Sequence, residues 1–162
     1  MGNSMAHLED PSPSADMLAR HPHLAPRTCF PKLTRAALAA KNLRCELRRA
    51  YPNLAISVVS EHFSMGNAIR VRVDVFPEDG LDDFGLSNLR QHVDYITQSF
   101  VYGHIENSAY PNARAFIDAF GGAKFGTVSC DWASPAQIAV RRQKVLSKTV
   151  AEPVKLRRGP RL

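Results

Sequence analysis

The serines, cysteines and histidines of this chain are the side chains that could do covalent or acid–base chemistry. The candidates for a nucleophile and a base are Ser60, Ser64, Cys130, His62, His92 and His104. Glu61 directly precedes His62 beside a glycine-containing loop, which makes these two the most plausible acid–base pair. The chain has no Gly-x-Ser-x-Gly elbow, no phosphate-binding P-loop and no His-Glu-x-x-His helix. The sequence therefore predicts a protein that is not an enzyme, assigns no catalytic residue, and leaves a hydrolase of unknown type as the least favoured alternative.

Metal ligation is the second chemistry to weigh. His21 and His23 flank a proline, and Cys29 follows nearby; such residue types bind zinc. The proline-rich, unpatterned setting makes coincidence the better interpretation. The three cysteines, Cys29, Cys45 and Cys130, are odd in number and lack the close pairs of zinc ribbons and redox motifs. We expect buried or incidental thiols, no disulfide framework, no metal site and no cofactor.

Positive charge is concentrated at the C-terminus. The formal net charge is +6, yet residues 1–32 balance, and residues 33–132 hold ten basic against eleven acidic side chains. Residues 133–162 hold eight basic side chains against Glu152 alone: Arg141, Arg142, Lys144, Lys148, Lys155, Arg157, Arg158 and Arg161. Because Lys and Arg neutralise phosphates and release counterions, these residues are the candidate contacts for DNA or RNA, without sequence preference. A tail that only solubilises the chain is the open alternative.

Helical periodicity begins after Thr34, a residue type that caps helix N-termini. Apolar residues then recur at three- and four-residue spacing as far as Ala50, and Pro52 disfavours helical geometry in the residue before it. Five basic residues make up a secondary basic surface: Lys41, Arg44 and Arg48 beside the apolar stripe, and Arg70 and Arg72 further along. The two interpretations are contact with phosphates and an ordinary solvated face, of which the second is favoured for the helix.

Residues 54–75 have the period-two pattern of two β-strands. In the second half, Ile69, Val71 and Val73 alternate with Arg70 and Arg72, so one face is apolar and the other charged. An antiparallel sheet with one face on a core and the other in water has this pattern. The small and turn-forming residues between the halves predict a hairpin whose loop covers 60–67.

The remaining elements follow from spacing and capping signals. Apolar spacing predicts helices over 86–100 and 113–120, β-branched and aromatic residues predict a strand over 124–132, and Ser134-Pro135 predicts a helix over 135–148. The expected fold is α+β: a small antiparallel sheet, made of the hairpin and one further strand, packed against two or three helices. The expected organisation is a disordered N-terminal segment over 1–32, an α+β domain over 33–132, and a basic helix and tail over 133–162.

The hydropathy of the sequence argues against a membrane-spanning protein and against a secreted one. No apolar run approaches the roughly 20 residues that a membrane-spanning helix needs, and the N-terminus lacks the apolar region of a secretory signal. The sequence therefore predicts a cytoplasmic protein with no membrane partner.

Three motifs together resemble a known family. They are a helix ending at Tyr51-Pro52, a strand–loop–strand with Phe63-Ser64-Met65-Gly66-Asn67 in its loop, and the segment Phe120-Gly121-Gly122-Ala123-Lys124-Phe125-Gly126. This pattern resembles the large polyvalent protein-associated domains, type twenty-nine, which recur in phage and conjugative-element proteins. The segment 101–112 looks like an insertion relative to that pattern. The resemblance implies a mobile-element setting and supplies no catalytic residues.

The resemblance and the charge distribution lead to two main hypotheses. The first is a non-enzymatic accessory or interaction module of a mobile genetic element that contacts nucleic acid through 133–162. The alternative is a protein-binding inhibitor of a host defence system, of the anti-restriction or anti-CRISPR type, whose partner is a host protein. Mimicry of DNA by the whole chain is excluded, because a net charge of +6 is opposite to the negative surface that mimicry requires.

Overall fold

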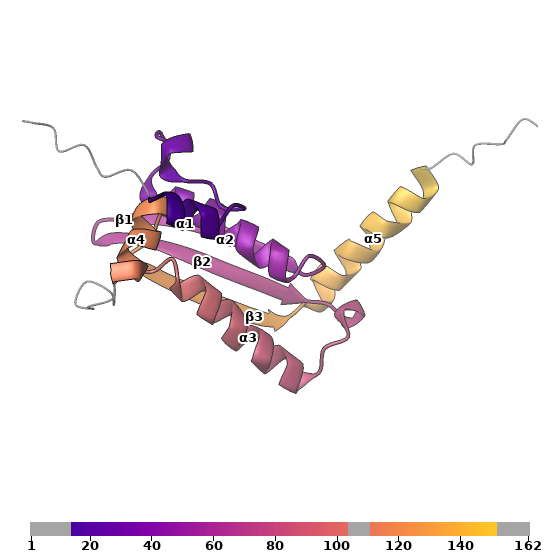
Figure 1. Ribbon diagram of the computed structural model, residues 1–162. Helices are drawn as coiled ribbons and strands as arrows, with labels where there is room; N and C mark the ends of the chain where they lie inside the picture. The colour runs from indigo at the N-terminus through magenta and orange to yellow at the C-terminus, as the bar shows by residue number, and fades with distance from the viewer. Residues whose placement is uncertain (1–13, 104–110, 152–162) are drawn as a thin grey trace, which may run out of the picture. The chain divides into compact units, whose positions relative to one another are not determined.

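The protein consists of two units that meet between Asp131 and Trp132. The computed structural model describes residues 14–103 and 111–151. Within these residues, the first unit contains a three-stranded sheet of order β1-β2-β3 with helices packed against it, and the second contains α5 (Pro135–Ala151) (Figure 1). The α+β class and the sheet built from a hairpin and one further strand are confirmed.

The hairpin is formed by β1 (Ala55–Phe63) and β2 (Gly66–Val75). The two strands are antiparallel, with Val58 opposite Val71 and Phe63 opposite Gly66. The connection is therefore the two residues 64–65, and the longer loop expected over 60–67 is corrected. The cross-strand pairing continues through polar residues such as Glu61 and His62 because main-chain pairing does not depend on side-chain polarity.

The third strand, β3 (Phe125–Trp132), lies beside β2 and runs parallel to it, so the sheet is mixed and not wholly antiparallel. The start of β3 is fixed to the start of β2, because the backbone N–H of Lys124 donates to Oδ1 of Asn67 at 2.8 Å. The chain between β2 and β3 contains two helices, and parallel neighbours need a long crossover of this kind. Alternation alone does not distinguish the two strand directions, which is why the sequence did not predict this one.

Helices α2 (Arg35–Ala50) and α3 (Asp83–Gln98) cover one face of the sheet. Thr34 caps α2 by accepting from the N–H of Ala37, as expected. Helix α3 begins earlier than the predicted residue 86, because Asp82 caps it by accepting from the N–H of Gly85 at 2.7 Å. The shared core contains Leu43 and Leu47 of α2, Leu89 and Val93 of α3, and Ile69, Val71 and Val73 of β2. Arg70 and Arg72 alternate with these buried residues of β2 and are exposed, so the other face of β2 is in water.

Residues 14–32 correct the expectation of a disordered N-terminal segment over 1–32. They contain helix α1 (Ala15–Arg20) and a short 3-10 helix, η1 (Arg27–Cys29), and Leu24 between them is buried in the core. Residues 1–13 lie outside the described part of the chain. The segment shows no clear periodicity because α1 has only six residues, of which Met17 and Leu18 pack against the core. Asn42 of α2 holds this segment by hydrogen bonds to the backbone of Ala25.

The connection from α3 to β3 includes α4 (Pro111–Phe120). Phe100 and Val101 are buried, and Val101 makes a parallel bridge to Ala123, so the first residues of the expected insertion over 101–112 belong to the core. Residues 104–110 of that segment are outside the described residues. The second short 3-10 helix, η2 (Pro77–Asp79), follows β2. In the described ranges, 14–103 and 111–151, we find no helix that has both the length and the hydropathy to cross a membrane.

Candidate functional site

The first candidate site is the basic helix α5, whose start is well defined by the sequence. Ser134 and Gln137 form a capping box: the N–H of Gln137 donates to Oγ of Ser134 at 3.3 Å, and the N–H of Ser134 donates to Oε1 of Gln137 at 2.7 Å. Pro135 occupies the first helical position, where its missing N–H costs nothing. The helix extends to Ala151, three residues beyond the predicted end.

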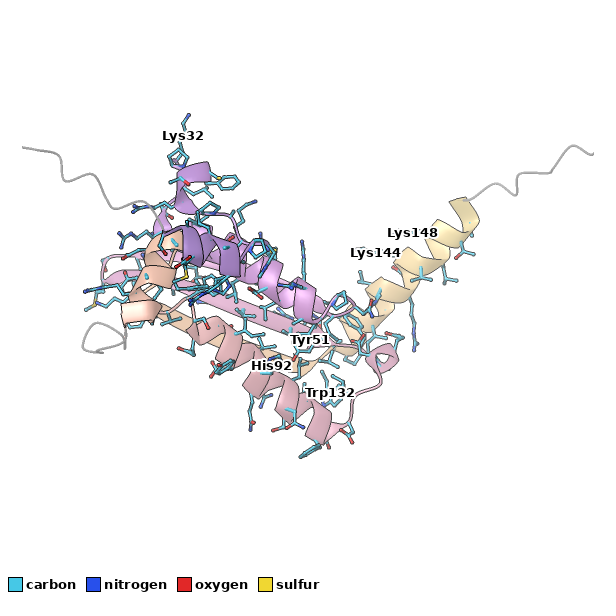
Figure 2. The ribbon with its side chains drawn as sticks, viewed as in Figure 1. Lys32, Tyr51, His92, Trp132, Lys144 and Lys148 are labelled. Atoms are coloured by element: carbon cyan, nitrogen blue, oxygen red, sulfur yellow. The ribbon has the colours of Figure 1, made fainter. Side chains whose placement is uncertain are left out.

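Helix α5 carries four of the predicted nucleic-acid contacts and no acidic residue. Arg142, Lys144 and Lys148 are exposed, and Arg141 is half-buried (Figure 2, in which Lys144 and Lys148 are labelled). Spacings of three and four residues place Arg141, Lys144 and Lys148 along one side of the helix. The other four predicted contacts, Lys155, Arg157, Arg158 and Arg161, lie outside the described residues.

Apolar side chains occupy an adjoining side of α5. Val145 and Leu146 are 58% and 65% exposed, and Ile138 precedes Val145 by two turns. The helix therefore offers both charge and apolar surface.

The secondary basic surface does not form one free patch. Lys41 lies over the ring of Phe30, with Nζ 4.8 Å from the ring centroid, and Arg44 donates to the carbonyl of Val58 on the edge strand β1. The two sheet arginines are ion-paired: Arg70 to Glu61 at 2.9 Å and Arg72 to Asp74 at 3.0 Å. Arg48 is exposed on α2. Most of these cations thus already have a partner within the fold.

The acid–base pair suggested by the sequence is not assembled. Adjacent residues on a strand point to opposite faces, and Glu61 bonds Arg70 while Nε2 of His62 lies 3.2 Å from Oγ1 of Thr34. Ser60 is half-buried on β1 and Ser64 lies in the hairpin turn. His104 lies outside the described residues.

His92 of α3 is hydrogen-bonded through Nδ1 to the hydroxyl of Tyr51 at the end of α2 (Figure 2). Cys130 of β3 is fully buried, and burial raises the pKa of its thiol to about 11, although the charge of Arg90 acts in the opposite direction. The pKa of Tyr51 is also raised, first by burial and then by the neighbouring Cys130. A thiol whose pKa is raised in this way is a poor nucleophile at neutral pH.

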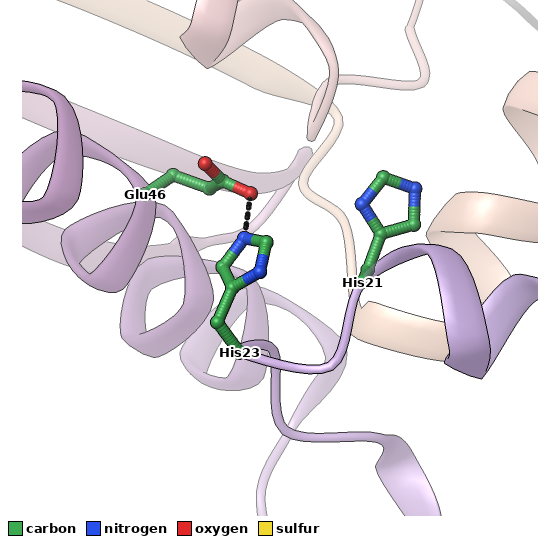
Figure 3. A group of neighbouring side chains, drawn as sticks. All are labelled: His21, His23 and Glu46. Atoms are coloured by element: carbon green, nitrogen blue, oxygen red, sulfur yellow. Dashed lines mark hydrogen bonds and ion pairs between the residues drawn. The ribbon is translucent and has the colours of Figure 1, made fainter.

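A second site, which the sequence did not predict, contains His21, His23 and Glu46 (Figure 3). One nitrogen of each imidazole and one carboxylate oxygen all lie within 4.8 Å of one another, and all three side chains are half-buried. Nε2 of His23 is hydrogen-bonded to Glu46, and Arg49 donates to Nδ1 of His23 at 2.9 Å. The two histidines were considered with Cys29, whereas the third group comes from α2, at a sequence separation that no local motif reveals.

A buried asparagine positions this second site. Asn42 of α2 accepts from the N–H of Ala25 at 2.8 Å and donates to its carbonyl at 2.9 Å. It also donates to the carbonyl of Phe120 at the end of α4, at 2.8 Å. Sγ of Cys45 donates to the carbonyl of His23 at 3.3 Å. These bonds hold the segment after α1 against α2, so the backbone that carries His23 is fixed.

The three comparisons with known proteins gave one result. A scan against models of protein families, a search of curated proteins and a search of solved structures found no match to this chain. The resemblance to the large polyvalent protein-associated domains stays a prediction.

Proposed function

We propose that this protein is a non-enzymatic accessory module that contacts nucleic acid through its basic C-terminal segment, with α5 as the described part of the contact surface. The observation that carries the proposal is the charge of α5: four cations and no acidic residue in Pro135–Ala151. Exposed cations such as Arg142, Lys144 and Lys148 attract phosphates and release the counterions that phosphates hold.

The first unit supports this assignment by contrast. Its sheet cations Arg70 and Arg72 are paired with Glu61 and Asp74, and Arg35 and Arg90 lie within 4.0 Å of Asp118 and Asp131. A phosphate would have to compete with a carboxylate at each of these positions. These four cations of the first unit are therefore partly neutralised, whereas α5 carries its cations with no acidic residue in its own sequence.

The proposal predicts binding with little sequence preference and strong salt dependence. The logarithm of the binding constant should fall linearly with the logarithm of the salt concentration, with a slope of about −0.7 to −0.9 per phosphate neutralised. Binding that relies on base contacts would depend on sequence and would weaken less steeply with salt.

A comparison of the full chain with a chain ending at Ala133 tests the proposal. Both would be titrated against a short duplex and a short single strand in gel-shift assays over a series of salt concentrations. The full chain should shift both probes at low salt and release them as salt rises, and the shortened chain should not bind. Equal binding by both chains, or none by either, contradicts the proposal.

The alternative function, an inhibitor that binds a host defence protein, is favoured by the exposed Val145 and Leu146 on α5. Apolar side chains on an exposed helix are typical of helices that dock in a partner's groove. Capture from host lysate at high salt distinguishes the two functions, because salt screens phosphate contacts and leaves apolar ones. A protein partner retained by the full chain at high salt, and lost from Val145→Ser/Leu146→Ser, would support the alternative.

The proposal places the protein in the cytoplasm and in a mobile genetic element. The mobile-element setting rests on the motif resemblance and is tested by the genes beside the one that encodes this protein. A relaxase, a methylase or a restriction-evasion cluster would support it, and a metabolic operon would contradict it.

A further inference from the structure

The geometry points to a transition-metal site, suited to zinc, formed by His21, His23 and Glu46. Two imidazole nitrogens and one carboxylate oxygen are a ligand set that zinc accepts, with water in the fourth position of a tetrahedral site. A single carboxylate oxygen does not suit magnesium or calcium, which prefer several oxygen ligands. The proposal concerns the first unit alone and is independent of the function assigned to α5.

The three ligands converge because of local chain geometry. His21 is the C-cap of α1, and Pro22 separates it from His23. One short segment therefore carries both imidazoles, whose ring centroids are 6.3 Å apart. Glu46 reaches them from the facing side of α2 (Figure 3). The His21 ring packs in T-shaped contacts against Phe116 and Phe120, at centroid distances of 5.1 and 5.6 Å, which restrict its rotation.

The three donor atoms are spaced almost as closely as the donor atoms of a bound zinc ion. Donor atoms on a tetrahedral zinc, each about 2.0–2.1 Å from the metal, lie about 3.3 Å apart. The three donor atoms here are within 4.8 Å of one another, and the His23 and Glu46 atoms are already in contact. Binding therefore requires His21 to approach by up to about 1.5 Å and the other two ligands to separate slightly.

Partial burial favours a metal at this place. The side chains of His23 and Glu46 are 20% and 25% exposed, so fewer waters compete with them for the ion. Glu46 supplies one negative charge, and the bonds from Asn42 and Cys45 fix the segment that carries His23. A ligand set that is held in place loses less conformational freedom on binding.

Arg49 opposes the metal. Its guanidinium donates to Nδ1 of His23, whereas the free nitrogen of a metal-bound histidine normally donates a hydrogen bond to an acceptor. The positive charge also repels the ion. Arg49 is exposed at the end of α2, so it can turn into water when the metal binds. This conflict gives the proposal a distinctive prediction: removing Arg49 should strengthen metal binding.

The test is calorimetric titration of the full chain, free of any affinity tag and treated with a chelator, with Zn²⁺ and separately with Mg²⁺. One Zn²⁺ should bind per chain, and Mg²⁺ should not. His21→Ala, His23→Ala and Glu46→Gln should each weaken Zn²⁺ binding at least about tenfold, by analogy with the losses seen on removing supporting groups. Arg49→Gln should bind Zn²⁺ more tightly than the unaltered chain.

Two controls keep the result interpretable. His92→Ala removes a histidine outside the cluster and should leave Zn²⁺ binding unchanged. Glu46→Gln preserves the shape of the side chain, and thermal unfolding without metal would show whether each variant remains folded. As a second readout, Co²⁺ should give the visible absorption of a tetrahedral site in the unaltered chain and lose it in Glu46→Gln.

The proposal is overturned if the unaltered chain shows no saturable Zn²⁺ binding. It is equally overturned if Glu46→Gln, folded as judged by its unfolding curve, binds Zn²⁺ and Co²⁺ as the unaltered chain does.

Discussion

Asn42 connects three parts of the first unit through one side chain. It is 1% exposed and bonds both backbone groups of Ala25 and the carbonyl of Phe120. A buried backbone group that loses its partner costs about 1–3 kcal/mol. We predict that Asn42→Leu lowers the free energy of unfolding by about 2–3 kcal/mol, measured by urea denaturation. Asn53→Ala, at an exposed position, is the control and should change it by less than about 0.5 kcal/mol. A similar small change in Asn42→Leu would show that the contacts are not stabilising.

The raised pKa of the Cys130 thiol should lower the free energy of unfolding at alkaline pH. The pKa of its thiol rises from 9.0 to about 11 in the folded chain, chiefly because of burial. Between these values the unfolded chain releases the proton while the folded chain keeps it, so the free energy of unfolding falls as pH increases. Below about pH 9 both states hold the proton and the contribution is fully present.

The measurement is the free energy of unfolding of the unaltered chain and of Cys130→Ala from neutral pH to pH 11. The variant should lose less stability over the upper part of the range, with Tyr51 accounting for some of what remains because its pKa is also raised. Parallel curves for the two chains would contradict this origin. Alkylation gives a direct check, since exposed Cys29 should react much faster than Cys130.

At the scale of elements, the end of α4 meets the start of α2 through Gly121. This glycine has φ +89°, and an added Cβ would lie 2.6 Å from the backbone N of Ala39 and the backbone O of Arg35. Gly80 also has a positive φ, +69°, but has no atom within 4 Å of that position. The two glycines therefore separate the cost of conformation from the cost of a clash.

We predict that Gly80→Ala destabilises the protein by about 1 kcal/mol, the cost of a left-handed residue that has a side chain. Gly121→Ala should cost more than about 2 kcal/mol, because α4 must also move away from α2. Chemical denaturation of both variants gives the comparison. Equal losses would mean that the contact between α4 and α2 adapts without cost.

Elements with a strong local pattern were predictable from the sequence. Helix α2 has a capping threonine, an apolar stripe and a following proline, and it lies where expected. The hairpin has clear alternation and was also predicted, although its strands continue closer to the turn than expected. Helix α1 and the buried Leu24 were missed because a helix of six residues is too short to show a clear periodicity. Asn42, which holds them, is indistinguishable in sequence from a solvated asparagine on a helix.

The two candidate sites differ in how far the sequence reveals them. The basic residues of 133–162 are close together in the chain, so composition alone marks them. The cluster of His21, His23 and Glu46 depends on the docking of the segment after α1 against α2, which is a tertiary contact. The residues of the secondary basic surface could also be found from their spacing in the sequence. Their partners in the fold could not be predicted from it; these are Phe30, Val58, Glu61 and Asp74.

At the scale of the whole molecule, the core lies entirely in the first unit. Every residue of the buried apolar cluster precedes Asp131, the last residue of that unit. We therefore predict that a chain ending at Ala133 folds and unfolds cooperatively, with a free energy of unfolding within about 1 kcal/mol of the full chain. Circular dichroism during thermal and urea unfolding would check this. A shortened chain without a cooperative transition would show that residues 134–162 contribute to the fold.

In the proposed function, external phosphates are bound by α5 and not by the cations of the first unit. Two triple variants with the same loss of charge test it: Arg142→Gln/Lys144→Gln/Lys148→Gln on α5, and Lys41→Gln/Arg70→Gln/Arg72→Gln on the first unit. The measurement is the slope of the logarithm of the binding constant for a short DNA against the logarithm of the salt concentration. The α5 variant should reduce the magnitude of the slope by about 2–3, from three lost phosphate contacts at 0.7–0.9 each, while the other variant leaves it unchanged. An equal reduction in both variants, or a reduction only in the second, would contradict the claim.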